Sequence, residues 1–130
     1  MMRYLFEPQS EFYFFKNWDD IPEALLKKLI PVCTPVFFNT SYFFASESLD
    51  EDKLANFVNR FVKNYSSSNI FFIFQNSSVI DRNTKYNNFK NKIDFKTYAN
   101  STEPVYYKTN PDNEKEPGSE MVYYEILTLV

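Results

Sequence analysis

Two groups of carboxylates are the residues of this chain whose types and spacing could do chemistry. The first is Asp19, Asp20 and Glu23, and the second is residues 50–52. Paired carboxylates can act as the acid and the base of a hydrolytic reaction. Both groups lie where a helix is expected to begin, and acids there cap backbone N–H groups and offset the helix dipole. Helix capping is therefore the simpler interpretation of both groups.

Other residues that commonly take part in catalysis or in phosphate binding are scarce. The sequence has no histidine, one cysteine and one glycine. Without histidine there is no imidazole base, no imidazole metal ligand and no triad that uses one. Cys33 lies among apolar residues and is expected to be buried, and Gly118 alone cannot form a glycine-rich phosphate loop. The composition predicts a protein that is not an enzyme and holds neither a cofactor nor a metal.

Charge is distributed unevenly along the chain, whose net charge is −3. Residues 82–108 carry six basic and two acidic side chains, and residues 109–130 carry one basic and five acidic side chains. The basic segment interleaves lysine with aromatic residues, a pattern that suits single-stranded nucleic acid, with Lys90, Lys92 and Lys96 as candidate contacts. An antiparallel strand with one wet face has the same pattern.

Acidic residues offer the opposite possibility, which is a negative surface for a basic protein. The candidate residues are Asp19, Asp20, Glu23, Glu114 and Glu116. Complementary charge speeds the capture of such a partner. The only tryptophan, Trp18, precedes the first group. It is expected either to pack in the core or, if exposed, to be a hot spot of a protein interface.

Two helices are expected to position these residues. The first begins near Asp20 and has leucines on its buried side. The second spans residues 49–65, where a capping box that begins at Ser48 precedes apolar residues at helical spacing. We expect Phe57 and Phe61 of the second helix to lie in the core.

Short aromatic and β-branched runs predict a mostly antiparallel sheet of about five to six strands. The expected strands lie within residues 3–6, 11–16, 35–38, 42–45, 70–80, 81–103, 105–109 and 121–130. Residues 70–74 are the expected central strand, and 105–109 should pair with 121–130 as a hairpin. Two helices and this sheet predict an α+β fold in a single domain, residues 1–130. A lone cysteine, the absence of a membrane-length apolar run and the lack of a secretory signal favour the cytoplasm.

In general type, the chain resembles bacterial immunity proteins that neutralise toxins of contact-dependent growth inhibition. Those are small, acidic single domains without enzyme motifs. The resemblance implies a non-catalytic protein-binding inhibitor whose partner is a basic toxin domain, for example a nuclease. Two alternatives stay open: a nucleic-acid-binding module that uses residues 82–108, and a phage or viral inhibitor of a host protein.

Overall fold

The computed structural model describes residues 13–31, 33–107 and 118–130. The chain divides into two compact units, Met1–Pro31 and Val32–Val130. Helices and a four-stranded sheet build the larger unit, so the α+β class expected from the sequence is confirmed.

The smaller unit contains the 3₁₀ helix η1 (Trp18–Asp20) and the helix α2 (Glu23–Leu29). Asp20 belongs to η1 and Pro22 is the N-cap of α2, so the expected capping by Asp20 is wrong. None of the residues of α2 is buried, although its leucines were expected to be. Seven residues are only two turns, which is too short for a full buried stripe.

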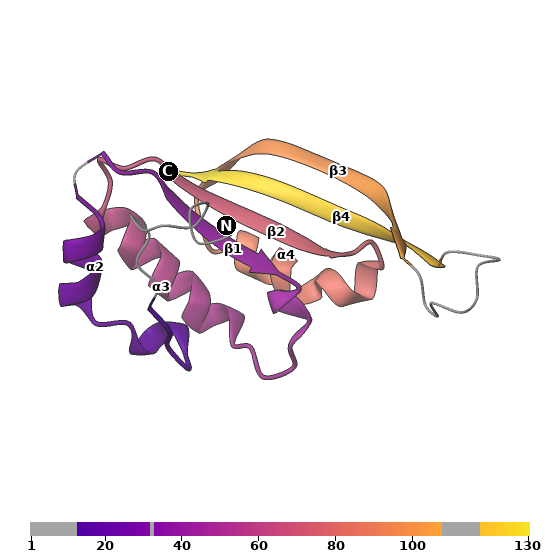
Figure 1. Cartoon of the computed structure of the whole chain (residues 1–130), viewed down its shortest axis with the longest axis horizontal. Coiled ribbons are helices and arrows are strands. Elements are labelled where there is room, and N and C mark those ends of the chain that lie inside the picture. The colour runs from indigo at the N-terminus through magenta and orange to yellow at the C-terminus, as the bar shows by residue number, and fades with distance from the viewer. Residues whose placement is uncertain (1–12, 32, 108–117) are drawn as a thin grey trace, which may run out of the picture. The chain divides into compact units, whose positions relative to one another are not determined.

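The sheet of the larger unit has the strand order β1-β2-β4-β3 (Figure 1). The strands are β1 (Val36–Ser41), β2 (Ile70–Ser77), β3 (Phe95–Tyr107) and β4 (Gly118–Leu129). β1 and β2 are parallel, whereas β4 is antiparallel to both β2 and β3. A parallel pair needs a crossover connection, and α3 (Glu51–Asn64) supplies it. The sheet is therefore mixed, and within the described part of the chain it has four strands where about five to six were expected.

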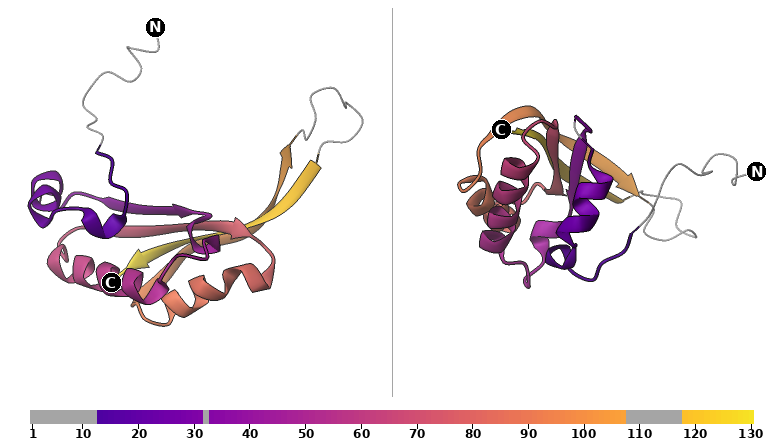
Figure 2. Two further views of the ribbon diagram at one scale, coloured as in Figure 1. Left: turned by 90° about the horizontal axis from the view of Figure 1, so that it is seen from below. Right: turned by 90° about the vertical axis from the view of Figure 1, so that its left-hand side faces the viewer.

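The helices α3 and α4 (Thr84–Lys90) lie on one side of this sheet (Figure 2). Aromatic rings fill the layer between them. The ring centroids of Phe72 and Phe89 are 4.9 Å apart, and Phe74 stacks on Tyr86 with ring centroids 3.6 Å apart. These ring pairs join β2 to α4.

The second expected helix is confirmed as α3, but the capping box that was expected to begin at Ser48 is wrong. Asp50 is its N-cap, and the Asp50 carboxylate accepts hydrogen bonds from the backbone N–H groups of Asp52 and Lys53. Phe61 is 5 % exposed and lies 5.0 Å from Phe38 of β1, whereas Phe57 is half-buried. The core therefore contains Phe61 in full and Phe57 in part.

Several expected strands are wrong. Residues 13–16 form no strand, residues 43–45 form the 3₁₀ helix η2 (Phe43–Ala45), and Ile80 begins another, η3 (Ile80–Asn83). Residues 3–6 lie outside the described part of the chain. The expected hairpin is confirmed as the β3/β4 pair, but β3 begins at Phe95. The helix α4 was missed because its buried residues, Tyr86 and Phe89, stand among asparagines and lysines.

Candidate functional site

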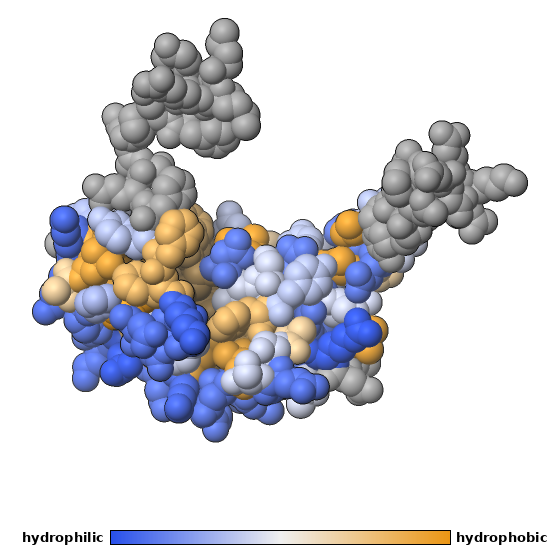
Figure 3. Space-filling view, turned by 60° about the horizontal axis from the view of Figure 1, so that its bottom comes forward, coloured by the Kyte–Doolittle hydropathy of each residue, from blue (hydrophilic) through white to orange (hydrophobic). Residues whose placement is uncertain are grey.

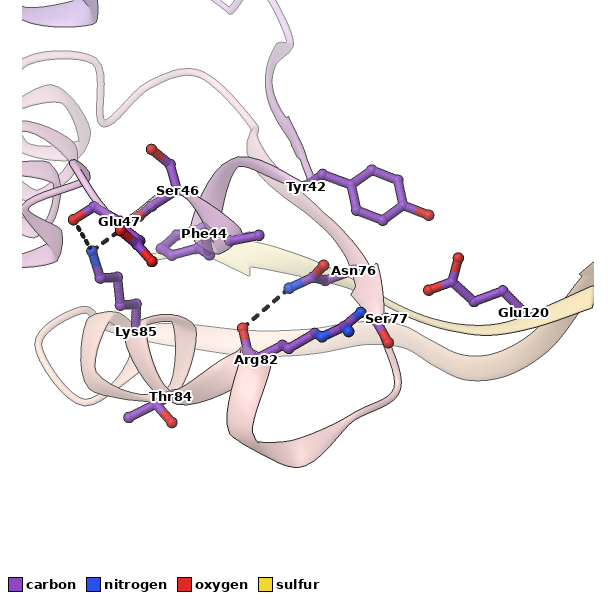
Figure 4. A pocket seen from close by; sticks show the side chains of 11 residues that line it. Tyr42, Phe44, Ser46, Glu47, Asn76, Ser77, Arg82, Thr84, Lys85 and Glu120 are labelled. Atoms are coloured by element: carbon purple, nitrogen blue, oxygen red, sulfur yellow. Dashed lines mark hydrogen bonds between the residues drawn. The ribbon is translucent and has the colours of Figure 1, made fainter.

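A cavity of about 570 Å³ lies where β1 and β2 end, beside η2 and the start of α4. Its lining residues are Tyr42, Phe44, Ala45, Ser46, Glu47, Asn76, Ser77, Arg82, Thr84, Lys85 and Glu120 (Figure 4). The lining combines aromatic and aliphatic surface with charges of both signs. Such a lining suits a side chain or small molecule that has both apolar and charged parts.

Lys85 fixes one wall of the cavity. Its ammonium group donates hydrogen bonds to the carbonyl oxygens of Ser46, Glu47 and Leu49 at 3.0, 2.9 and 2.7 Å. An ammonium group has three N–H donors, so all of them are used within the protein. Lys85 therefore holds the segment that leads into α3 and offers no donor to a ligand.

Arg82 and Glu120 bring opposite charges to the cavity. The Asn76 side chain donates to the Arg82 carbonyl at 3.2 Å and thereby holds the backbone from which the Arg82 side chain extends. Figure 4 shows that this side chain runs along the cavity, with Glu120 pointing in from β4. Among the described residues, neither charge belongs to an ion pair. Both are therefore available to a bound group.

Tyr42 stands at the same place in a left-handed backbone conformation, with φ of 58°. This conformation is uncommon for residues other than glycine and is found more often at functional sites than elsewhere. Its N–H donates to the Gln75 carbonyl at 2.7 Å, which ends the β1/β2 ladder and turns the chain into η2. The tyrosine side chain remains 46 % exposed beside the cavity.

A buried carboxylate, Glu125 of β4, forms a second polar cluster. It is 3 % exposed and accepts hydrogen bonds from Tyr86 at 2.8 Å and from Tyr123. The ammonium group of Lys90 lies 2.6 Å from the same carboxylate and over the rings of Tyr86 and Phe95. A buried charge with this many partners is a stable structural element.

The cluster shifts the ionisation of its members. Burial acts to raise the pKa of Glu125, but hydrogen bonds from Lys90, Tyr123 and Tyr86 outweigh it and hold the pKa below its usual value. Burial and the hydrogen bond to Glu125 raise the pKa of Tyr123 to about 12 and that of Tyr86 still further. Glu125 is therefore ionised at neutral pH, and both tyrosines are hydrogen-bond donors.

The paired ends of β3 and β4 form an arm, which comprises residues 104–107 and 118–121. They run past the last residue of β2, since Ser77 pairs with Val122. Figure 2 shows this end of the hairpin bending away from the layer of helices. Val105, Tyr106 and Met121 are 45, 69 and 47 % exposed. Among the described residues, neither a helix nor a third strand covers these apolar side chains of the arm. Hydrophobic residues also gather in surface patches elsewhere (Figure 3).

The lysines predicted to bind nucleic acid do not form one free basic surface. Lys90 is paired with Glu125, and Lys92 is paired with Asp52. Lys96 is exposed on β3. The alternation that suggested a binding segment comes from a helix followed by a strand.

The predicted acidic residues fall in separate places. Asp19, Asp20 and Glu23 are exposed in the smaller unit, beside the half-buried Trp18. Glu114 and Glu116 lie outside the described residues, in the connection between β3 and β4. Cys33 is exposed, so its expected burial is wrong. The Glu125 cluster was not expected from the sequence, although Glu125 follows the same alternation as Leu127 and Leu129 and so had to share their buried face.

Comparison with known proteins leaves the function to be argued from the site. The chain matches no protein-family model, no curated protein and no solved structure. Within residues 13–31, 33–107 and 118–130, no group of three or more acidic or cysteine side chains could hold a metal ion. No helix in this part of the chain is long and apolar enough to cross a membrane.

Proposed function

We propose that this protein is a non-catalytic inhibitor that binds a basic protein partner through the arm and the cavity at its base. The arm is the observation that supports this proposal. Its exposed Tyr106 and Met121 give the aromatic and sulfur-containing surface that is enriched in protein interfaces. Glu120 belongs both to the arm and to the cavity lining, so the two form one continuous surface.

The charge of residues 103–120, which include the arm, Glu103 and the connection between β3 and β4, favours a basic partner. Residues 103–120 hold five acidic and two basic side chains, a net charge of −3, which equals the net charge of the whole chain. In the described strands, no lysine or arginine occurs after Lys96. Negative charge beside apolar surface steers a basic groove toward the arm, and the apolar contacts then slow its release.

The polar clusters favour binding over turnover. Lys85 has all its donors bonded to carbonyl groups, and Glu125 is held by three partners. A general acid or base must be free to exchange a proton with a substrate. Both groups are instead committed to the fold, and the chain has no histidine to replace them.

The finer form of the proposal is an immunity or antitoxin protein that blocks a toxin domain, for example a nuclease. A basic phosphate-binding groove is the surface that an acidic arm fits best, because the acids take the place of phosphates. A phage or viral inhibitor of a host protein would use the same arm against a different target.

The test is affinity capture from the native host with the full chain, followed by identification of the bound protein. We expect a basic protein whose activity is inhibited by the purified chain. The double variant Glu103→Lys/Glu120→Lys should lose this protein, whereas Lys96→Glu, a charge reversal outside the arm, should retain it. Equal capture by the wild type and the Glu103→Lys/Glu120→Lys variant would refute the proposal.

Binding of single-stranded nucleic acid is the second candidate. One observation favours it: Lys96 accompanies a row of rings on the sheet face opposite the helices. In this row Phe37 stacks on Phe71 with ring centroids 5.1 Å apart, and Phe71 makes an edge-to-face contact with Tyr98 with ring centroids 6.1 Å apart. Bases stack on such rings, but one lysine supplies little phosphate contact. Gel-shift titration at low salt tests it, and micromolar binding that is lost in Lys96→Glu would replace the protein-binding proposal.

A further inference from the structure

The two edges of the sheet differ in how they are protected. β3, at one edge, contains Lys96, Glu103 and Pro104, and it has a bulge after Thr97. Charges, proline and bulges on an edge strand prevent another strand from pairing with it. β1, at the other edge, has the sequence VFFNTS and contains none of these. Only β1 therefore has the chemistry of an edge that accepts a further strand.

The backbone of β1 is oriented for such pairing. The N–H groups of Val36 and Tyr42 donate toward β2, to Asn69 and Gln75 at 2.8 and 2.7 Å. Alternate residues of a parallel strand bond to the same neighbour with both N–H and C=O. The backbone groups of Phe37 and Asn39 therefore point away from β2, toward the edge. The Ser41 N–H bonds to the Asn39 side chain at 3.3 Å, which closes the edge at that end.

The side chains on this edge carry no charge, and one of them is a large aromatic ring. Phe37 is 62 % exposed, and its ring stacks on Phe71 of β2 at 5.1 Å with planes 13° apart. Asn39 and Ser41 are also exposed and carry no charge. A ring this exposed at an open edge loses much water-accessible apolar surface when a strand is added beside it.

We propose that β1 pairs antiparallel with β1 of a second copy of this chain, which joins two four-stranded sheets into one. A twofold axis normal to the sheet brings two identical strands together antiparallel and leaves the helices of both copies on the same side. Two copies with a net charge of −3 each repel one another, and β1 itself contributes no charged side chain to such a contact. This inference goes beyond the proposed function, because the arm is formed by β3 and β4 and stays free.

The test is the molar mass of the full chain by light scattering and sedimentation, from low micromolar concentration upward. We expect twice the chain mass for the wild type. Asn39→Pro removes an N–H from the open edge without touching the ladder to β2, and should weaken dimerisation roughly tenfold or more. Asn39→Ala is the matched control, since it loses the same side chain but keeps the N–H, and should remain dimeric.

Two further variants keep the result interpretable. Phe37→Lys places a charge on the same edge and should also be monomeric, which replaces Asn39→Pro if that variant does not fold. Tyr106→Ala, in the arm, should leave the mass unchanged, which separates this inference from the proposed function. A wild type that is monomeric at every concentration would overturn it. So would a folded Asn39→Pro or Phe37→Lys variant that dimerises as tightly as the wild type.

Discussion

The two halves of β4 place charged and apolar side chains in opposite surroundings. Beneath the helix layer, the carboxylate of Glu125 is 3 % exposed and tied to three donors. In the arm, Met121 is 47 % exposed, and Tyr106 of the neighbouring strand is 69 % exposed. Apolar side chains are usually buried and charged side chains are usually exposed to water, so the buried carboxylate and the exposed apolar residues both depart from the usual pattern. The body of the sheet is therefore organised for a defined fold, whereas the arm exposes the surface through which we propose that the protein binds its partner.

The largest loss of stability is expected when an aromatic ring is removed from the body of the sheet. Phe61→Ala should cost about 3–5 kcal/mol of unfolding free energy, because Phe61 is 5 % exposed and packs against rings of β1 and α3. Phe57→Ala should cost less, since Phe57 is half-buried. Urea denaturation measures both. A loss below about 1 kcal/mol for Phe61→Ala would mean that this face of α3 is not part of the core.

The next largest loss of stability is expected when the buried charge of Glu125 is removed. Glu125→Gln leaves the Lys90 ammonium group, whose side chain is 21 % exposed, without its carboxylate. Loss of one partner of such a pair should cost roughly 3 kcal/mol. Glu103→Gln, on the exposed side of β3, is the control and should change stability by no more than about 0.5 kcal/mol. Equal effects in urea melts would show that the Glu125 cluster does not stabilise the fold.

A smaller effect is expected from pH. The pKa of Tyr123 is raised to about 12 in the fold, so its contribution is complete below the ordinary tyrosine value of about 10 and is lost between the two. The pKa of Glu125 is lowered, so its contribution is present above the ordinary glutamate value and is lost as the pH falls. Stability measured in urea should decline in the alkaline window. Tyr123→Phe should make that decline shallower, and an unchanged decline would contradict the assignment.

The sequence predicted the elements whose pattern is local and strong. The α3 helix has a capping acid and a long apolar stripe, and residues 70–74 form an unbroken apolar run, so both were found. The α4 helix has only two buried residues among polar ones, and its position is set by rings on β2 that no local pattern reveals. Tyr42 was predicted to be extended, but the end of the β1/β2 ladder turns it into a left-handed conformation.

The candidate site was less predictable than the fold because it depends on pairings distant in sequence. Lys90 was a candidate for phosphate contact, but its ammonium group forms an ion pair with Glu125, which is distant in sequence. The arm is formed because β3 and β4 both extend beyond the end of β2. The length of a strand depends on the strand with which it pairs and not on its own residues alone. The sequence could show that charge is distributed unevenly along the chain. It could not show which charges were already paired.

The smallest effect on stability is expected in the arm, together with a large effect on binding. Tyr106→Ala should change the unfolding free energy by no more than about 0.5 kcal/mol, because the ring is 69 % exposed. If the arm binds the partner, the same change should weaken that complex by about 2 kcal/mol, or roughly thirtyfold. Calorimetric titration of the captured partner measures this. Tyr98→Ala is the matched control, since Tyr98 is 71 % exposed on β3 but outside the arm, and it should leave the affinity unchanged. If Tyr98→Ala weakens the complex and Tyr106→Ala does not, the open face of the sheet is the binding surface. The contrast between body and arm would then be one of packing alone.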